Sequence, residues 1–421
     1  MLGRRGLTQL LYQAGTVSQL RCNASRSAAA GCQFQIATYC LAKYPSSPKY
    51  KLDWKRYYST RKSPYFIGTN TSISAQPLDM DQPYPASGAD GFVTISFYSF
   101  FELPANMLQA LRDKIQREWS EDLGLVGRIY LYDHGINAQL SIPKENIQNL
   151  RKWLESNPSF SGRIGKFNWA LEHNRAFKAL HVRVRPLVAA GEMLDLNVLA
   201  NEPEYLPPAE WEHELRDQPD ALLLDMRNVY EHRVGRFDNA QCPDADTFRE
   251  EMAVVRDMCA QRPHDAPIFM YCTGGIRCSV AGAFLKADGY TNVKTLQGGV
   301  VAYGRYARQT GKSLFKGKNF TFDKRRGEEV TSDVLAKCDQ CGEPCDTFAN
   351  CANNSCNLLF IQCPACAQKH HGTCGCSECV ERAQMSHDQL IQNRLPPRWT
   401  HRERVRPELV FKNGVIRTAS A

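Results

Sequence analysis

One cysteine lies in a context that favours a reactive thiolate. Cys272 follows a short apolar run and precedes a predicted helix that begins near Arg277. Glycines in the intervening loop permit unusual backbone conformations, so successive amides can point at one centre. The helix N-terminus and the Arg277 guanidinium add positive potential there, which stabilises a thiolate over a thiol. The sequence therefore predicts Cys272 and Arg277 as catalytic residues beside four anion-binding loop residues, Thr273, Gly274, Gly275 and Ile276.

Three further residues are candidates for the same site. Asp225 and Arg227 follow another apolar strand and are predicted to bind substrate or an anion. Asp225 can accept hydrogen bonds from the loop or pair with Arg277, and a helix cap or a local ion pair is the structural alternative. Cys278 lies six residues after Cys272 and is expected to pack inside the helix, with a role as resolving thiol as the alternative.

A second group of chemically active residues is a cluster of ten among the seventeen cysteines, namely Cys338, Cys341, Cys345, Cys351, Cys356, Cys363, Cys366, Cys374, Cys376 and Cys379. Three pairs have Cys-x-x-Cys spacing, 338/341, 363/366 and 376/379, and such a pair can wrap one tetrahedral ion. Two structural zinc ions would use eight ligands, with His370 and His371 as candidate extras. Iron–sulfur clusters and a metal-free cysteine-rich tail are the alternatives. We expect a zinc-binding module over residues 336–382.

The elements that must position Cys272 alternate between strand and helix. The pattern predicts strands at 221–224, 267–271 and 293–296, and helices at 246–258 and 277–288. Such alternation is typical of an open parallel α/β sheet, in which ligands bind at the carboxyl ends of the strands. Gly298 and Gly299 are expected to serve a turn. This domain is expected over residues 203–311.

An earlier domain, residues 91–190, has a different pattern. Strands are predicted at 92–100, 126–132, 136–142 and 180–188, and helices at 104–119 and 143–154. The order β-α-β-β-α-β is that of a ferredoxin-like α+β domain. A chain of 421 residues with three such regions is expected to be a multi-domain α/β protein.

The remaining segments are polar or basic. Residues 1–58 are expected to be an organelle transit peptide, because positions 1–52 contain seven Lys or Arg residues and no Asp or Glu. Mitochondrial import is favoured, with a plastid or the cytoplasm as alternatives, and a reducing interior favours metal thiolates over disulfides. Residues 59–90 are expected to be a disordered linker, 312–335 a basic connector and 383–421 an Arg-rich tail. No run of eighteen apolar residues exists, so no membrane span is expected.

Several motifs resemble known families. Residues 272–277, 225–227 and 296–299 (Leu-Gln-Gly-Gly) resemble the rhodanese domain. Longer runs between about residues 91 and 381 resemble the tRNA uridine hydroxylase (TrhO) family. These runs are 127–131 (Gly-Arg-Ile-Tyr-Leu), 135–141 (Gly-Ile-Asn-Ala-Gln-Leu-Ser), 271–278 (Tyr-Cys-Thr-Gly-Gly-Ile-Arg-Cys), 317–323 (Gly-Lys-Asn-Phe-Thr-Phe-Asp), 338–341 (Cys-Asp-Gln-Cys) and 356–363 (Cys-Asn-Leu-Leu-Phe-Ile-Gln-Cys).

The resemblance implies oxygen-dependent hydroxylation at carbon 5 of the wobble uridine, with tRNA as partner, dioxygen as small-molecule co-substrate and Cys272 as the essential cysteine. It also implies an acylphosphatase-like domain, a rhodanese domain and a cysteine-rich C-terminal module. No flavin or haem signature is present. One hypothesis is that Cys272 adds to carbon 6 of uridine, which makes carbon 5 enolate-like. The loop alone predicts instead a rhodanese-type sulfurtransferase with a persulfide on Cys272, and a non-enzymatic zinc scaffold is a third hypothesis that the intact loop argues against.

The sequence departs from the family pattern at three places. His134 stands where Glu is frequent, Ser279-Val280 replace Glu-Lys, and His232-Arg233 follow Tyr230-Glu231 where Tyr-Glu is often repeated. RNA contacts are expected from basic residues of the connector, with a solvated connector as the alternative: Lys316, Lys318, Lys324, Arg325 and Arg326. Stacking on bases is an option for aromatics that more often belong to a core: Tyr130, Tyr132 and Trp169.

Overall fold

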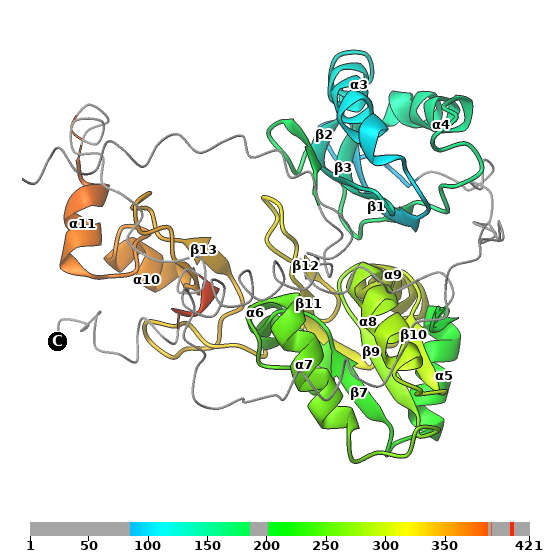
Figure 1. The fold of residues 1–421 in the computed structure, drawn as a ribbon. Helices are drawn as coiled ribbons and strands as arrows, with labels where there is room; N and C mark the ends of the chain where they lie inside the picture. Colours follow the sequence, from blue (N-terminus) through cyan, green and yellow to red (C-terminus); the bar gives the residue numbers. More distant parts are fainter. Residues whose placement is uncertain (1–84, 186–200, 386–388, 390–404, 408–421) are drawn as a thin grey trace, which may run out of the picture. The chain divides into compact units, whose positions relative to one another are not determined.

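The structure is a computed structural model that describes residues 85–185, 201–385, 389 and 405–407 (Figure 1). The expected transit peptide, nearly all of the expected linker and most of the expected tail lie outside the described residues. In the described part of the chain, helices are too short or too polar to cross a membrane.

The first domain is an α+β domain with two helices packed on a five-stranded sheet. The strands are β1 (Phe92–Phe100), β2 (Val126–Tyr132), β3 (Gly135–Pro143), β4 (Asn168–Trp169) and β5 (Leu180–Val184), in the order β4-β1-β3-β2-β5. The helices are α3 (Leu108–Glu121) and α4 (Ile147–Ser156), each entered through a short 3-10 turn, η1 (Ala105–Met107) and η2 (Lys144–Asn146). The predicted order is confirmed, and the short edge strand β4 was not predicted.

Side-chain spacing explains this domain. Helix α3 buries Leu108, Leu111, Ile115 and Trp119, which recur at helical spacing along one face. Strand β1 turns three alternate residues into the same core, because alternate residues of a strand face one side: Val93, Ile95 and Phe97. The other face of β1 carries Tyr98, which is important for the site described below.

The second domain is the expected open parallel sheet. Its strands are β6 (Glu204–Leu206), β7 (Leu222–Asp225), β9 (Ile268–Tyr271) and β10 (Val293–Leu296), all parallel in the order β6-β10-β9-β7. Its long helices are α5 (Pro208–Asp217), α7 (Phe248–Cys259), α8 (Ile276–Ala287) and α9 (Gly299–Thr310). A short helix α6 (Val229–Val234) and strand β8 (Gly235–Phe237) follow β7. Neither β6, α5, α6, β8 nor α9 was predicted.

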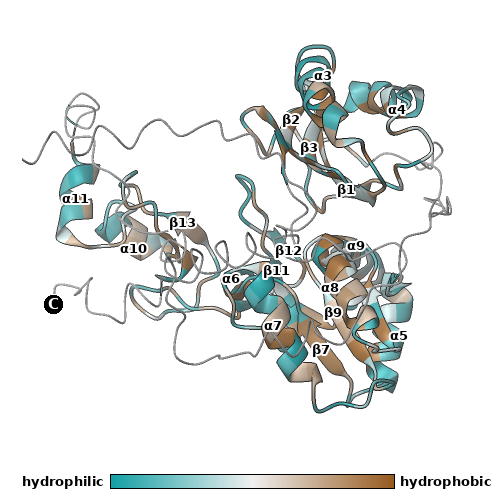
Figure 2. Ribbon diagram, in the orientation of Figure 1, coloured by the Kyte–Doolittle hydropathy of each residue, from teal (hydrophilic) through white to brown (hydrophobic). Residues whose placement is uncertain are grey.

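Both faces of the sheet are buried at β7 and β9, which explains why these two strands are almost entirely apolar (Figure 2). Leu224 and Met270 contribute to one core with residues of α7 and α8. Leu223 and Phe269 contribute to the other core with residues of α5 and α9. Since the helices on both sides fix the central strand β9, the residue that follows it, Cys272, is held at the carboxyl edge of the sheet.

The expected basic connector is part of the fold. Strand β11 (Phe315–Asn319) pairs antiparallel with β8 and with β12 (Glu328–Glu329), giving a sheet in the order β12-β11-β8. The apolar ring of Phe315 is fully buried against the second domain. The predicted basic connector thus contains a strand, in which the two lysines of β11 alternate with residues that are buried.

The cysteine-rich module is small and has little regular structure. A hairpin of β13 (Phe348–Asn350) and β14 (Leu359–Ile361) precedes two short helices, α10 (Pro364–Lys369) and α11 (Ser377–Ala383). Cysteines make up most of one of its buried clusters, together with Leu358 and Phe360. A core of this kind depends on what the sulfur atoms bind.

Candidate active site and metal centres

The loop after β9 wraps its backbone around the Cys272 sulfur. The Gly275 amide donates a hydrogen bond to Cys272 Sγ (3.1 Å), and Gly275 is the N-cap of helix α8. Its φ of 104° is a conformation that other residues rarely adopt. A Cβ on Gly275 would also lie 2.8 Å from the hydroxyl of Tyr98, which comes from β1 of the first domain. The other predicted loop residues, Thr273, Gly274 and Ile276, lie beside Gly275 in the sequence of the same loop.

The loop stabilises the thiolate form of Cys272. Cys272 is only 1% exposed, and this burial opposes ionisation. A hydrogen bond from the Cys278 thiol, the charge of Arg277 and the amides of Cys278 and Gly275 outweigh burial and lower the pKa of Cys272 to about 6. The thiolate therefore predominates at neutral pH, and it is the nucleophilic form of cysteine. Cys278 is fully buried in α8 and packs as expected, but it also has this polar role.

Arg277 is held by a carboxylate that the sequence did not assign to the site. Its guanidinium donates to both oxygens of Glu231 (3.0 and 3.1 Å) and to the Thr273 hydroxyl (3.1 Å), while that hydroxyl donates to Glu231 (2.7 Å). Glu231 is fully buried, and this burial raises the pKa of its carboxyl. Arg277, Arg227 and the Thr273 hydroxyl lower the same pKa by more, so the carboxyl is held below its usual range. Glu231 thus fixes the guanidinium beside the loop.

Asp225 and Arg227 form a buried pair at the end of β7. The Arg227 guanidinium donates to both carboxylate oxygens of Asp225 (2.8 and 2.7 Å), and neither side chain is exposed. Asp225 also accepts from the Tyr271 hydroxyl (2.8 Å) and lies 2.7 Å from His232 Nδ1. Of the options for Asp225, the pair with Arg277 is not formed, because Glu231 binds Arg277, and the alternative of a local ion pair is the one that the structure shows. Both side chains support the strand that delivers Cys272.

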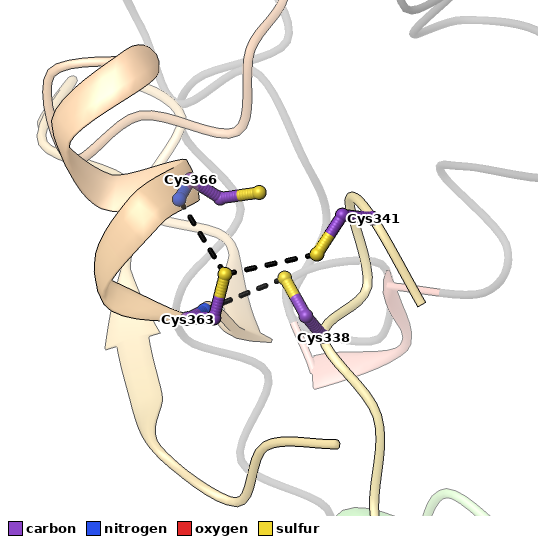
Figure 3. A group of neighbouring side chains, drawn as sticks. All are labelled: Cys338, Cys341, Cys363 and Cys366. Atoms are coloured by element: carbon purple, nitrogen blue, oxygen red, sulfur yellow. Dashed lines mark hydrogen bonds between the residues drawn. The ribbon is translucent and has the colours of Figure 1, made fainter. Parts of the chain in front are cut away.

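Eight of the ten clustered cysteines form two four-sulfur groups. One group is Cys338, Cys341, Cys363 and Cys366, whose sulfurs converge in Figure 3; the other is Cys351, Cys356, Cys374 and Cys379. In each group all four sulfurs lie within 4.8 Å of one another. The sulfur–sulfur separations of 3.7 Å for Cys341–Cys363 and 4.0 Å for Cys356–Cys374 fit a tetrahedron about a zinc ion, whose edges are about 3.8 Å for Zn–S bonds of about 2.3 Å. Both groups can hold a metal ion.

The ligand sets differ in part from the expected ones. Cys345 and Cys376 belong to neither group, and neither do His370 and His371. The pair 376/379 does not act as a unit, because the second group takes Cys374 in place of Cys376, whose sulfur lies 3.8 Å from that of Cys374. Sequence spacing alone favoured 376/379 as a ligand pair. In the structure Cys376 is instead the N-cap residue of α11.

Comparison with known proteins agrees with this architecture. Three family models match, described as a UPF0176 acylphosphatase like domain (residues 92–188), a Rhodanese-like domain (208–305) and Rhodanase C-terminal (316–380). A protein of Enterobacter sp. (strain 638) named tRNA uridine(34) hydroxylase is 43% identical over 291 residues, which cover 68% of this chain and 82% of that protein. A protein of Escherichia coli (strain SMS-3-5 / SECEC) with the same name is 42% identical over 310 residues, covering 73% and 84%.

The chain belongs to the tRNA uridine(34) hydroxylase family. It is therefore an enzyme of the oxidoreductase class, with a rhodanese domain between an acylphosphatase-like domain and a cysteine-rich module. The rhodanese domain supplies the Cys272 loop described above.

Most of the residues at which this chain departs from the family pattern make specific contacts in the structure. His232 contacts Asp225, and Arg233 donates to Asp339 (2.6 Å), which links the rhodanese domain to the cysteine-rich module. The Ser279 hydroxyl lies 3.1 Å from the Tyr98 hydroxyl and donates to the Gly275 carbonyl (3.2 Å). His134 is exposed beside Asp133, away from these contacts.

Three site residues were not predicted from the sequence. Glu231 and its partner Arg277 are 46 positions apart in the sequence, and Tyr98 and Ser279 are 181 positions apart. No local sequence pattern therefore marks either contact. Glu251 of α7 is nearly buried, and burial raises the pKa of its carboxyl to about 8 although Arg277 opposes this shift. Its position on the apolar face of an otherwise amphipathic helix is the one signal that was available.

Proposed function

We propose that this protein hydroxylates carbon 5 of uridine 34 in tRNA and that Cys272 is its nucleophile. The observation that carries the proposal is the buried sulfur of Cys272, which the loop holds as a thiolate with a pKa of about 6. The names of the relatives supply the substrate, since a thiolate loop alone does not specify RNA. Dioxygen is the proposed co-substrate.

The proposed chemistry begins with a covalent bond between enzyme and base. Cys272 Sγ adds to carbon 6 of uridine, and the π electrons of the ring double bond move toward carbon 5 and the carbonyl oxygen O4. Carbon 5 then takes up dioxygen, and a proton completes a hydroperoxide. A small-molecule thiol reductant supplies two electrons and two protons, which release one oxygen atom as water. Loss of the carbon 5 proton breaks the C–S bond and restores the thiolate.

Each loop residue has a defined part in this proposal. The amides of Gly275 and Cys278 and the charge of Arg277 stabilise the anion that forms when Sγ adds to the ring. Glu231 holds Arg277 in place, so the guanidinium loses little freedom during the reaction. The buried pair of Asp225 and Arg227 acts through the sheet edge that positions the loop.

We also propose that the two four-cysteine groups bind zinc and that this zinc is structural. Four thiolates in a closed tetrahedral arrangement leave no open position for a substrate, which is typical of structural zinc. When bound, zinc would supply cross-links that stabilise a module with few apolar residues. Purified protein should contain about two zinc ions per chain by elemental analysis, and Cys345→Ala should keep both while Cys341→Ala should lose one.

Mitochondrial import is the proposed role of residues 1–58. The support is compositional, because basic residues are frequent there and acidic residues are almost absent. A fusion of residues 1–70 to a fluorescent protein should enter mitochondria, and a fusion in which Arg4, Arg5, Arg21 and Arg26 are changed to Glu should not. Cytoplasmic fluorescence of the unchanged fusion would reject this proposal.

The hydroxylase proposal is tested by nucleoside analysis. Digested tRNA from cells that lack the protein should have lost 5-hydroxyuridine or its derivatives, and re-expression of the wild type but not of Cys272→Ser should restore them. The rhodanese loop also suits sulfur transfer, with a persulfide on Cys272. Unchanged nucleosides together with a thiosulfate:cyanide transfer activity that depends on Cys272 would favour that second function.

A further inference from the structure

A groove in the described part of the chain is lined by all three domains, and residues 272–277 of the catalytic loop are not part of its lining. Its volume is about 800 Å³. The acylphosphatase-like domain contributes Arg128 and Lys178, the rhodanese domain contributes Asn228 and Tyr230, and the segment between β11 and β12 contributes Lys324 among others. The cysteine-rich module and residues 405–406 complete the wall. A ligand in this groove would therefore contact every domain of the enzyme.

The groove carries an excess of positive charge. Its two acidic residues are both neutralised, Asp246 by Arg406 (2.5 Å) and Asp323 by Arg325 (2.9 Å between Nε and Oδ1). Four cations of the lining have no carboxylate partner among the described residues: Arg128, Lys178, Lys324 and Arg326. They come from three separate segments, so this is not a local charge run on one helix. Unpaired cations in a concavity attract a polyanion.

Aromatic rings form the apolar part of the same groove. Phe177 lies beneath the Arg128 guanidinium, 5.9 Å from its ring centroid. Tyr230, Phe320 and Phe322 pack edge to face against one another at centroid distances between 5.2 and 6.5 Å. Cations combined with aromatic rings are the pattern that holds single-stranded RNA, in which phosphates meet the cations and unpaired bases meet the rings.

One wall of the groove is connected to the catalytic loop through the side chain of the buried Glu231. Asn228 and Tyr230 line the groove, and the neighbouring Glu231 binds Arg277 and Thr273 of the loop. The Asn228 side chain also donates to Glu231 (2.8 Å). The wall of the groove and the carboxylate that holds Arg277 therefore belong to the same short segment, residues 228–231.

We propose that this groove binds the phosphate backbone of the anticodon loop, with Arg128, Lys178, Lys324 and Arg326 as the phosphate contacts. The identity of the RNA rests on the proposed function, whereas the binding of a single-stranded RNA rests on the charges and rings described above. The groove is a binding surface that lies apart from the reacting sulfur of Cys272, so it contributes affinity and register and not bond chemistry.

The test measures binding separately from activity. The full-length protein is titrated against a fluorescent anticodon stem-loop RNA that contains uridine at the wobble position, over a series of salt concentrations. Removal of one phosphate-binding cation should lower the slope of log K against log salt by about 0.7. The double variant Lys324→Ala/Arg326→Ala should therefore lower the slope by about 1.4, and Arg128→Ala and Lys178→Ala by about 0.7 each. The control Lys152→Ala removes an exposed lysine of α4 that is not part of the groove and should change nothing.

The outcomes separate this proposal from the proposed function. Groove variants that keep both the affinity and the salt slope of the wild type would overturn the groove, whether or not the protein hydroxylates tRNA. An equal reduction with Lys152→Ala would also overturn it, because binding would then depend on overall charge. Wild-type protein that binds the stem-loop through these four residues but leaves tRNA nucleosides unchanged would reject the hydroxylase function and support the groove.

Discussion

Removal of the Cys278 thiol should change the titration of Cys272 more than any other single deletion in the loop. After burial, which opposes ionisation, the hydrogen bond from Cys278 is the largest influence on the pKa of Cys272. A hydrogen bond to a charged group contributes about 1.5–3 kcal/mol, and about 1.4 kcal/mol moves a pKa by one. We therefore expect Cys278→Ala to raise the pKa of Cys272 from about 6 to about 7–8.

The effect is large enough to measure as a rate. At pH 7 the thiolate fraction should fall from about 90% to between about 50% and 10%, so alkylation by iodoacetamide should slow by about two- to tenfold. Mass spectrometry of the Cys272 peptide is needed because the chain has seventeen cysteines. The rate at each pH is divided by the plateau rate at high pH, which removes any difference in access to the buried sulfur.

Two matched variants make this experiment decisive. Cys278→Ser keeps a donor at the same place, so its midpoint should stay closer to that of the wild type than that of Cys278→Ala. Cys259→Ala removes a thiol from the same core cluster that is not among the groups that shift the pKa of Cys272, and should leave the midpoint at about 6. A midpoint of about 6 in Cys278→Ala would refute the reasoning, because the loop amides and Arg277 would then suffice.

Three further predictions concern the same loop. Folding lowers the pKa of Cys272 from its ordinary value of 9.0 to about 6, so its thiolate stabilises the fold fully above about pH 9. This contribution is lost as the pH falls through 6. Urea denaturation should therefore show that the difference in unfolding free energy between the wild type and Cys272→Ala changes by at most about 4 kcal/mol between about pH 9 and pH 6. Gly275→Ala should abolish hydroxylation and lower the melting temperature, because a Cβ would strain a φ of 104° and meet the Tyr98 hydroxyl; full activity would show that the loop is less restricted than its geometry indicates. Glu231→Gln should cost about 3 kcal/mol of unfolding free energy by leaving Arg277 without its charged partner, whereas a decrease under about 1 kcal/mol would show that Arg277 is solvated instead.

The sequence predicts the parts of this fold that depend on local pattern. Strand β9 is a run of four apolar residues, and both of its faces are buried, so composition alone indicates it. Helix α9 was not predicted, because it begins beside two glycines that suggested only a turn. Gly298 and Gly299 do make that turn, with φ of 71° and 63°, but the helix continues from it. Strand β11 was missed because its lysines concealed the alternation of buried residues.

The site likewise has a part that the local sequence predicts and a part that it does not. Cys272, the glycines and Arg277 are neighbours in sequence, so their chemistry can be inferred from the motif. The partner of Arg277 cannot, because Asp225 and Glu231 are both carboxylates near the same sheet edge and only the path of α6 decides between them. The ligand groups of the cysteine module are similarly non-local, since Cys351 and Cys374 belong together across 23 positions.

The burial of Cys272 sets a condition on any reaction with a base. Cys272 is 1% exposed as a residue, so its sulfur has to become accessible before it can meet a uridine ring. Tyr98 and Phe100 of the acylphosphatase-like domain lie against the loop and its core, so that domain covers the site from one side. The Tyr98 hydroxyl is held by a hydrogen bond to Ser279, a contact of about 1 kcal/mol that RNA binding can offset. The same domain contributes Arg128 and Lys178 to the groove, so an RNA bound there would contact the domain that packs against the loop of the nucleophile. Coupling of this kind would keep a reactive thiolate protected until its substrate is bound.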